Sequence, residues 1–347
     1  MCSSDLGRDG DWNGEADYNM RVEVSEYEKR YVFNLESITQ LCGLNIVRKT
    51  YILESIRKYF STYKYSEERN RWRDNVKIDN ELVGRKFFTV LSIGGFSDLL
   101  AMIKWSKQSL MVEYVKQLML KYDLQQHLQI INEELKEIFQ VLNEDIGDLG
   151  DVELSYAMSD VWEMVQKSNL TGSEQSVLED KESGELILIL LNLLEQVMQV
   201  NPRKMIVIME NLDHLVSRTE YVNILNRMQM VSMKYEVYFI VSTSLEGYVK
   251  FEKDICSGIT VFGDEDVQMP EWEKISDFIN DSYPCNKILA EEQIQMDLEH
   301  IVHRIGQQKF LNSLEEDVIC KLINQTLMLN DRWENVESVP EIAFLKA

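Results

Sequence analysis

The chain of 347 residues is poor in proline, glycine and cysteine, and each shortage excludes a class of structure. With only 4 Pro and 15 Gly, it lacks the frequent turns of an all-β protein, so long helices are expected. The 5 Cys lie far apart and form no CxxC pair, which excludes a zinc finger or a disulfide framework and indicates a reducing cytoplasm. The longest apolar run, near Leu186–Met198, is short and interrupted by polar residues. It predicts a buried helix rather than a membrane span.

The first nineteen residues differ in composition from the rest. Residues 1–19 hold five acidic residues, one arginine and few apolar side chains, without the charged-then-apolar order of a signal peptide. The stretch CSSDL corresponds to a common sequencing adapter translated in frame. We therefore expect residues 1–19 to be an assembly artefact and the natural chain to start at Met20. The alternative is a disordered acidic tail.

Charge is unevenly distributed along the chain. The 36 basic and 59 acidic residues give a net charge of −23, which by itself argues against a nucleic-acid partner. Residues 20–120, however, hold 17 basic and 12 acidic residues, a net charge of +5, whereas residues 121–200 carry −13 and residues 201–347 carry −11. A basic face on an acidic body is typical of a protein that holds a polyanion in one place. The alternative is that acidic neighbours such as Glu54, Glu67 and Glu81 pair with these cations on a solvated face.

The segment CGLNIVRKT, residues 42–50, resembles a Walker A loop with one position changed. Gly43, Lys49 and Thr50 have the required spacing, but Arg48 stands where the second glycine belongs. The apolar stretch SITQLC before the glycine and an amphipathic helix from Lys49 onward predict the strand–turn–helix context of such a loop. A β-carbon at position 48 crowds the turn whose backbone amides would cradle a phosphate. We therefore expect a degenerate nucleotide loop.

A second nucleotide-site motif follows, also weakened. Met205–Met209 is fully apolar and predicts a strand at the Walker B position. Glu210 and Asn211 hold the two places where an Asp would orient Mg²⁺ and a Glu would activate water. Two damaged motifs in the correct order indicate descent from a P-loop ATPase with loss of hydrolysis, so no catalytic residue is assigned.

The pattern of predicted strands and helices indicates an α/β fold with a mostly parallel sheet. Strands are expected near 20–24, 31–34, 37–42, 87–93, 205–209, 237–243 and 259–262, with helices between most of them. A heptad seam, formed by Leu124, Leu128, Ile131, Leu135, Ile138 and Leu142, predicts a projecting helical subdomain. We expect a degenerate P-loop NTPase-like head in two parts, 20–96 and 201–270, interrupted by an α-helical leg, 97–200, and followed by a helical region, 271–347.

Four segments together resemble one protein family. YEKRYVFNLESITQLCGLN, KYFSTYKYSEE, RKMIVIMENLDHLV and YEVYFIVSTSLEGYVK are similar, in order and spacing, to the long-form Csn-two family of CRISPR-associated proteins, over residues 20–347. The resemblance implies a type II-A spacer-acquisition protein without ATPase activity. It also implies a homotetrameric ring whose positively charged channel encloses double-stranded DNA loaded from free ends. Implied partners are the Cas-one/Cas-two integrase and the effector nuclease in a bacterial cytoplasm, with no membrane.

A DNA-enclosing ring requires cations on its inner wall that contact phosphates. The candidates lie between residues 48 and 77 and are Arg48, Lys49, Arg57, Lys58, Lys64, Arg69, Arg71, Arg73 and Lys77. Two other functions stay open: an active P-loop ATPase or kinase, and an acidic protein-interaction scaffold that does not bind DNA.

Metal binding is left without assigned ligands. Short-form members of the family bind calcium, so calcium is the one cofactor that the resemblance implies. The acidic runs at 144–153 and 264–266 lack the alternating ligand spacing of an EF-hand loop. His300 and His303 share a helical spacing and are expected to lie on a helix surface.

Overall fold

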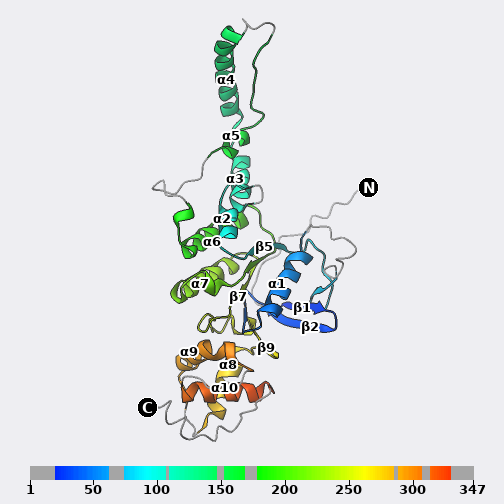
Figure 1. The fold of residues 1–347 in the computed structure, drawn as a ribbon, viewed down its shortest axis with the longest axis vertical. Helices are drawn as coiled ribbons and strands as arrows, with labels where there is room; N and C mark the ends of the chain where they lie inside the picture. Colours follow the sequence, from blue (N-terminus) through cyan, green and yellow to red (C-terminus); the bar gives the residue numbers. More distant parts are fainter. Residues whose placement is uncertain are drawn as a thin grey trace, which may run out of the picture.

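The computed structural model describes residues 20–61, 74–106, 109–146, 152–168, 178–284, 288–306 and 313–329. The strands are β1 Met20–Glu26, β2 Lys29–Leu35, β3 Ile38–Cys42, β4 Val76–Ile78, β5 Thr89–Ile93, β6 Met205–Met209, β7 Val237–Ser242, β8 Ile259–Phe262 and β9 Asp266–Gln268. The α-helices are α1 Ile46–Tyr59, α2 Phe96–Ile103, α3 Leu110–Lys121, α4 Gln125–Ile146, α5 Trp162–Gln166, α6 Ser183–Val200, α7 Arg218–Ser232, α8 Trp272–Ser282, α9 Glu291–Ile301 and α10 Leu314–Thr326. The molecule is elongated, with α4 at one end, the sheet in the middle and α8–α10 at the other end (Figure 1).

The central sheet has the strand order β5-β6-β7-β3-β8-β9. All neighbours pair in parallel except β9, which runs antiparallel to β8. Strands covered on both faces read as continuous apolar runs, and β3 and β6 are indeed buried along their whole lengths. The predicted α/β fold with a mostly parallel sheet is therefore confirmed.

Alternate side chains of β6 divide between two cores on opposite faces of the sheet, as the period of two in a strand requires. Val207 and Met209 pack in the core that contains α2, α6 and α7. Ile206 and Ile208 pack in the core that contains α1 and the small sheet β2-β1-β4. By length and composition α6 passes the test for a membrane span, but half of its 18-residue window is buried against the protein. It lies in the core between the sheet and its neighbouring helices, as a buried helix should.

The small antiparallel sheet confirms the predicted β-hairpin and adds a strand that the sequence reading missed. β1 and β2 pair from Met20↔Leu35 to Glu26↔Lys29. No strand was predicted between residues 42 and 87, but Val76 and Ile78 are buried and β4 pairs with β1. Two apolar residues separated by one residue are enough to add a third strand to this sheet, and so short an alternation gives only a weak signal in the sequence.

The leg consists of α3, α4 and α5. An extended segment between α4 and α5, residues 152–160, is called the strap. The strap runs back along α4, where Asn143 exchanges two hydrogen bonds with the backbone of Leu154, and Asn132 does the same with Met158. The predicted seam is only partly covered: no residue of α4 is buried, and Ile138 is 54% exposed. α6, at the end of the predicted leg segment 97–200, packs on the sheet, so the projecting part is shorter than that segment.

The C-terminal region contains α8, α9 and α10 around a core of its own. That core includes Val261 of β8, Val267 of β9 and Cys42 at the end of β3. Ser313 and Glu316 form a capping box at the start of α10, with each side chain bonded to the other residue's backbone amide. The region therefore covers the β8–β9 edge of the sheet, next to the loop that follows β3.

Candidate functional site

The loop after β3 has the predicted strand–turn–helix context, and its first residue must be glycine. Gly43 has φ +94°, and a Cβ there would lie 2.5 Å from the carbonyl oxygen of Phe262. The amide of Asn45 also donates to that oxygen, at 2.9 Å. The loop is thus packed directly on the backbone that follows β8, and no other residue type fits at position 43.

Helix α1 begins three residues earlier than predicted, at Ile46 instead of Lys49. The reason is Asn45, whose side-chain oxygen accepts from the amide of Arg48 at 3.2 Å and whose carbonyl accepts from the amide of Lys49 at 3.3 Å. Asparagine is among the preferred N-cap residues. Residues 46–48, which would wrap around a phosphate in a Walker A loop, are therefore wound into the helix, and two amides of the would-be cradle are already bonded.

The lysine of the motif points into the protein. Lys49 is 2% exposed, and its Nζ donates to the carbonyl of Gly43 at 2.7 Å, the carbonyl of Thr243 at 2.5 Å and the hydroxyl of Ser244 at 2.7 Å. An ammonium group has three donors, and all three are used by protein oxygens. Lys49 therefore joins the loop after β3 to the loop after β7. Thr50, the expected Mg²⁺-binding hydroxyl, lies exposed on α1.

Two further titratable side chains surround this lysine. Asp213 is 3% exposed, and one of its carboxylate oxygens accepts from the amides of Ser244 and Leu245 at 2.6 and 2.8 Å. His303, in the 3₁₀ turn Val302–Arg304, is 1% exposed, with its Nε2 3.4 Å from the hydroxyl of Thr243. No partner within the described part of the chain contacts its Nδ1.

Burial sets the protonation of this cluster. It lowers the pKa of Lys49 to about 8, against the opposing effects of Cys42 and Asp213. It lowers the pKa of His303 to about 4, with nearby Lys49 acting in the same direction and Asp213 against it. It raises the pKa of the Cys42 thiol to about 12. At neutral pH the cluster therefore holds a charged lysine and a neutral histidine.

The acids that follow β6, Glu210 and Asp213, have different hydrogen-bond partners. Glu210 follows β6, and its carboxylate has a long contact of 3.4 Å with the hydroxyl of Ser92. Asp213, three residues later, is the acid whose carboxylate accepts hydrogen bonds from the loop after β7. The sequence reading placed the second motif at Glu210 and Asn211. The left-handed backbone of Asn211 and the 3₁₀ turn Leu212–His214, which bring Asp213 inward, carry no pattern that would have shown this.

Arg48 binds the neighbouring acidic turn instead of a phosphate. Its guanidinium lies 2.6 Å from the carboxylate of Asp266 and also donates to the carbonyls of Gly263 and Asp264. Burial raises the pKa of Asp266, although the hydrogen bond and the charge of Arg48 act in the opposite direction. The arginine that replaced the glycine thus fixes the loop to the β8–β9 turn.

The nine DNA-binding candidates now divide into four groups, the first of which is Arg48 with its partner Asp266. Arg57 and Lys58 lie on α1 and pair with Glu54 at 3.3 and 2.7 Å, while Lys77 of β4 pairs with Glu23 at 3.7 Å. Lys49 is buried, so we withdraw it from the DNA-binding set. The other four candidates, Lys64, Arg69, Arg71 and Arg73, lie outside the described residues, as do residues 1–19. The predicted DNA-binding candidates did not include Lys29 and Arg30, which are exposed on the β1–β2 hairpin in the same third of the chain.

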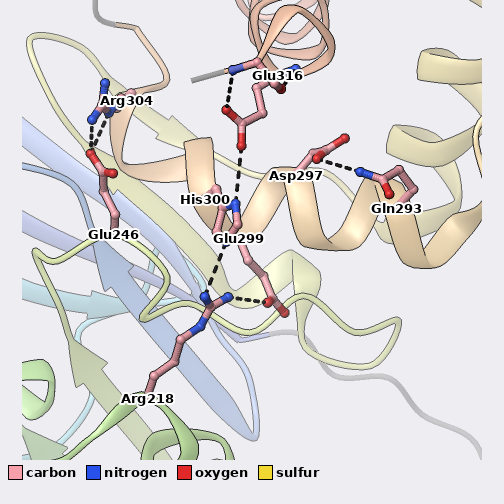
Figure 2. Close-up of polar contacts among 9 residues, drawn as sticks. Arg218, Glu246, Gln293, Asp297, Glu299, His300, Arg304 and Glu316 are labelled. Carbon is pink, nitrogen blue, oxygen red and sulfur yellow. Dashed lines mark hydrogen bonds and ion pairs between the residues drawn. The ribbon is translucent and has the colours of Figure 1, made fainter. Parts of the chain in front are cut away.

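The junction between the head and the C-terminal region is polar (Figure 2). Arg218, at the start of α7, donates to Glu299 at 3.4 Å and to Nε2 of His300 at 3.3 Å. Because an arginine only donates, Nε2 of His300 is the acceptor and Nδ1 carries the proton that faces Glu316, at 3.3 Å. Arg304 and Glu246 form a second ion pair across the junction. His303 is buried, so its expected place on a helix surface is wrong: α9 ends at Ile301, and the 3₁₀ turn rotates the ring inward.

Metal ligands do not gather in the part of the chain that the structure describes. No group of three or more His, Cys, Asp or Glu side chains there is placed to hold an ion.

Comparison with known proteins gives one family and one close fold. The family model described as CRISPR-associated protein Csn2 subfamily St matches residues 24–345. The search of curated proteins returned no match. The crystal structure of Stu0660 of Streptococcus thermophilus superposes with a TM-score of 0.80 at 23% identity, over 94% of this chain and 99% of that one. At this identity the likeness concerns the fold alone.

Two SMC head structures are more distant. The SmcHead bound to the C-winged helix domain of ScpA has a TM-score of 0.38 at 11% identity, over 72% of this chain and 97% of that one. The SMC head domain from Thermotoga maritima has a TM-score of 0.31 at 11% identity, over 72% of this chain and 98% of that one.

Proposed function

The chain belongs to the Csn2 family of CRISPR-associated proteins, subfamily St, and on this premise we propose that it is a non-enzymatic protein that binds the ends of double-stranded DNA during spacer acquisition. In this proposal four copies form a ring in the bacterial cytoplasm and hand DNA to an integrase, in association with the effector nuclease. Binding is independent of sequence, because it rests on phosphate contacts. Calcium is the metal to test.

The observation that carries the non-enzymatic part is the position of Lys49. In a nucleotide-hydrolysing loop this ammonium reaches the β- and γ-phosphates. Here it is 2% exposed and saturated by three protein oxygens. Opening the site would require breaking those bonds and unwinding the first turn of α1, which Asn45 caps. Calorimetry with Mg-ATP should therefore detect no binding, and tight binding that Lys49→Ala abolishes would revive the enzyme hypothesis.

The DNA-binding part is supported by the cations of the first third of the chain. Arg57 is 47% exposed in its side chain and Lys77 is 37% exposed, so each keeps a solvent-facing surface although one acid pairs with it. The Arg57–Glu54 pair is exposed and contributes little, about 0–1 kcal/mol, so Arg57 can exchange its carboxylate partner for a phosphate. Four copies would multiply the net +5 of residues 20–120 around one channel.

Assembly is supported by apolar side chains left exposed on the leg. Ile130, Ile138 and Val141 of α4 are 55, 54 and 65% exposed, and Leu154 of the strap is 43% exposed. Three of the four lie on one helix, and exposed apolar surface of this kind commonly marks a protein–protein interface. A second copy of the chain is the partner that the ring proposal requires.

The test combines light scattering with binding of a blunt linear duplex and of closed circular DNA. A tetramer should bind the linear form more tightly, with affinity that falls steeply as salt rises, because bound cations release counterions. Arg57→Glu should weaken binding several-fold, whereas Lys121→Glu, an exposed cation at the end of α3, should not. Equal affinity for both forms would exclude end loading. No binding at low salt would exclude DNA as the ligand and favour the acidic scaffold.

A further inference from the structure

Two adjoining cavities follow α3 along the leg, and Lys116 and Trp162 line both of them. The larger, of about 640 Å³, lies where α3 passes into α4. The smaller, of about 320 Å³, reaches inward to Trp105. We call the two together the leg groove. Their shared walls make them one continuous surface on the leg.

The inner end of the leg groove contains an unused hydrogen-bond donor. The indole Nε1 of Trp105 is buried, and no side chain or carbonyl of the described residues accepts from it. The ring is fixed by an edge-on contact with Trp162, at 6.1 Å and 76°, and Nζ of Lys116 lies 5.0 Å from the centre of the Trp162 ring. Trp105 and Trp162 therefore form the inner wall of the leg groove.

The outer end combines apolar and acidic side chains. Leu120 is 79% exposed and Tyr122 is 65% exposed, and both line the groove together with Asp123 and Asp160. Residues 110–168 hold 4 basic and 12 acidic residues, a net charge of −8. The leg as a whole is therefore acidic, and at the groove itself two aspartates outnumber Lys116, so a cationic ligand is favoured.

We propose that the leg groove binds a cationic, amphipathic segment of a partner protein. Its apolar side chains fill the groove at Leu120 and Tyr122, and its lysines or arginines face Asp123 and Asp160. This is helix- or strand-in-groove recognition with a charged rim. The inference concerns the leg alone and does not depend on DNA binding by the head.

The experiment uses the full chain, labelled with 5-fluorotryptophan, and two synthetic fourteen-residue peptides. Both peptides carry leucine at helical spacing, one with lysine and the other with glutamate at every remaining position. Fluorine NMR reports the environments of Trp105 and Trp162, assigned from Trp105→Phe and Trp162→Phe. Fluorescence anisotropy of the labelled peptides reports affinity. The lysine peptide should bind, saturate and shift both resonances, while the glutamate peptide should not bind.

Three variants separate a specific groove from general charge attraction. Leu120→Asp should weaken binding of the lysine peptide at least tenfold, although it adds an acid, because it removes an apolar contact. Trp105→Phe, which removes a buried Nε1 that the peptide does not reach, should leave it unchanged within about twofold. Val222→Asp, an equally acidic change at an apolar residue of α7 that is 37% exposed, should leave it unchanged.

Equal affinity in wild type and Leu120→Asp, or unshifted tryptophan resonances, would overturn the proposal. Resonances that shift with protein concentration in the absence of peptide would assign the groove to a second copy of the chain and also overturn it. Loss of DNA binding in the head variants would leave the peptide result unaffected, so the two proposals fail separately.

Discussion

Acid should destabilise this protein through His303. Burial of the ring, with the charge of nearby Lys49 acting in the same direction, holds the pKa of His303 at about 4 in the folded chain, compared with 6.5 for an unhindered histidine. Between these two values the unfolded chain takes up a proton and the folded chain does not, so unfolding becomes more favourable as pH falls. The shift of about 2.5 pKa units corresponds to about 3 kcal/mol, of which about 2 kcal/mol is lost by pH 5.

The assay is urea unfolding of wild type and His303→Gln between pH 7.5 and 5. Glutamine keeps a polar group near Thr243 but does not titrate. The free energy of unfolding of the wild type should therefore fall by about 2 kcal/mol more than that of the variant over this range. His127→Gln, at an exposed position on α4, is the matched control and should keep the wild-type slope. Parallel pH profiles for wild type and His303→Gln would refute the assignment of a buried neutral histidine.

Two further predictions concern the loop and the strap. Gly43→Ala should lower the free energy of unfolding by about 2–4 kcal/mol, because the new methyl meets the backbone of Phe262 and residue 43 has a positive φ. In the same urea titration Gly84→Ala, which has open space around it, should change the free energy of unfolding by less than about 1 kcal/mol. Equal effects of the two substitutions would contradict the packing argument. Asn143→Ala removes both hydrogen bonds to Leu154, so amide exchange of the strap should rise without a change in the core strands; unchanged exchange would show that the strap is held by other contacts.

Much of the fold could be predicted from the sequence because strong local patterns coincide with global packing. The apolar runs of β6 and β7 and the hairpin β1–β2 lie where the alternation and burial patterns indicated. Short elements were missed, because β4 and β9 have only three residues each. The alternation of apolar and polar residues that predicts a strand needs a longer segment to be recognised. The leg was predicted as helical, but its heptad seam is only partly covered by the strap, whose residues 152–160 show no periodic pattern.

The candidate site was predicted in its parts but not in its geometry. The sequence indicated a damaged loop from Arg48, and the structure gives that arginine a partner, Asp266, 218 residues away. The inward turn of Lys49 depends on carbonyls of Gly43 and Thr243, and backbone oxygens have no residue-type signal. His303 entered the cluster because a 3₁₀ turn follows α9, and helix ends are among the least predictable features of a sequence.

Retention of a Walker-like sequence in this loop therefore has a structural explanation. Gly43 is required because the backbone of Phe262 leaves no room for a β-carbon. Lys49 is required because three oxygens, on the loops after β3 and β7, converge on its ammonium group. Together with Asp213 and His303, these residues join the first strand of the parallel sheet, the strand beside it and the C-terminal region. A motif that would bind a nucleotide in an enzyme here connects three parts of the chain, and its persistence is not evidence for a nucleotide.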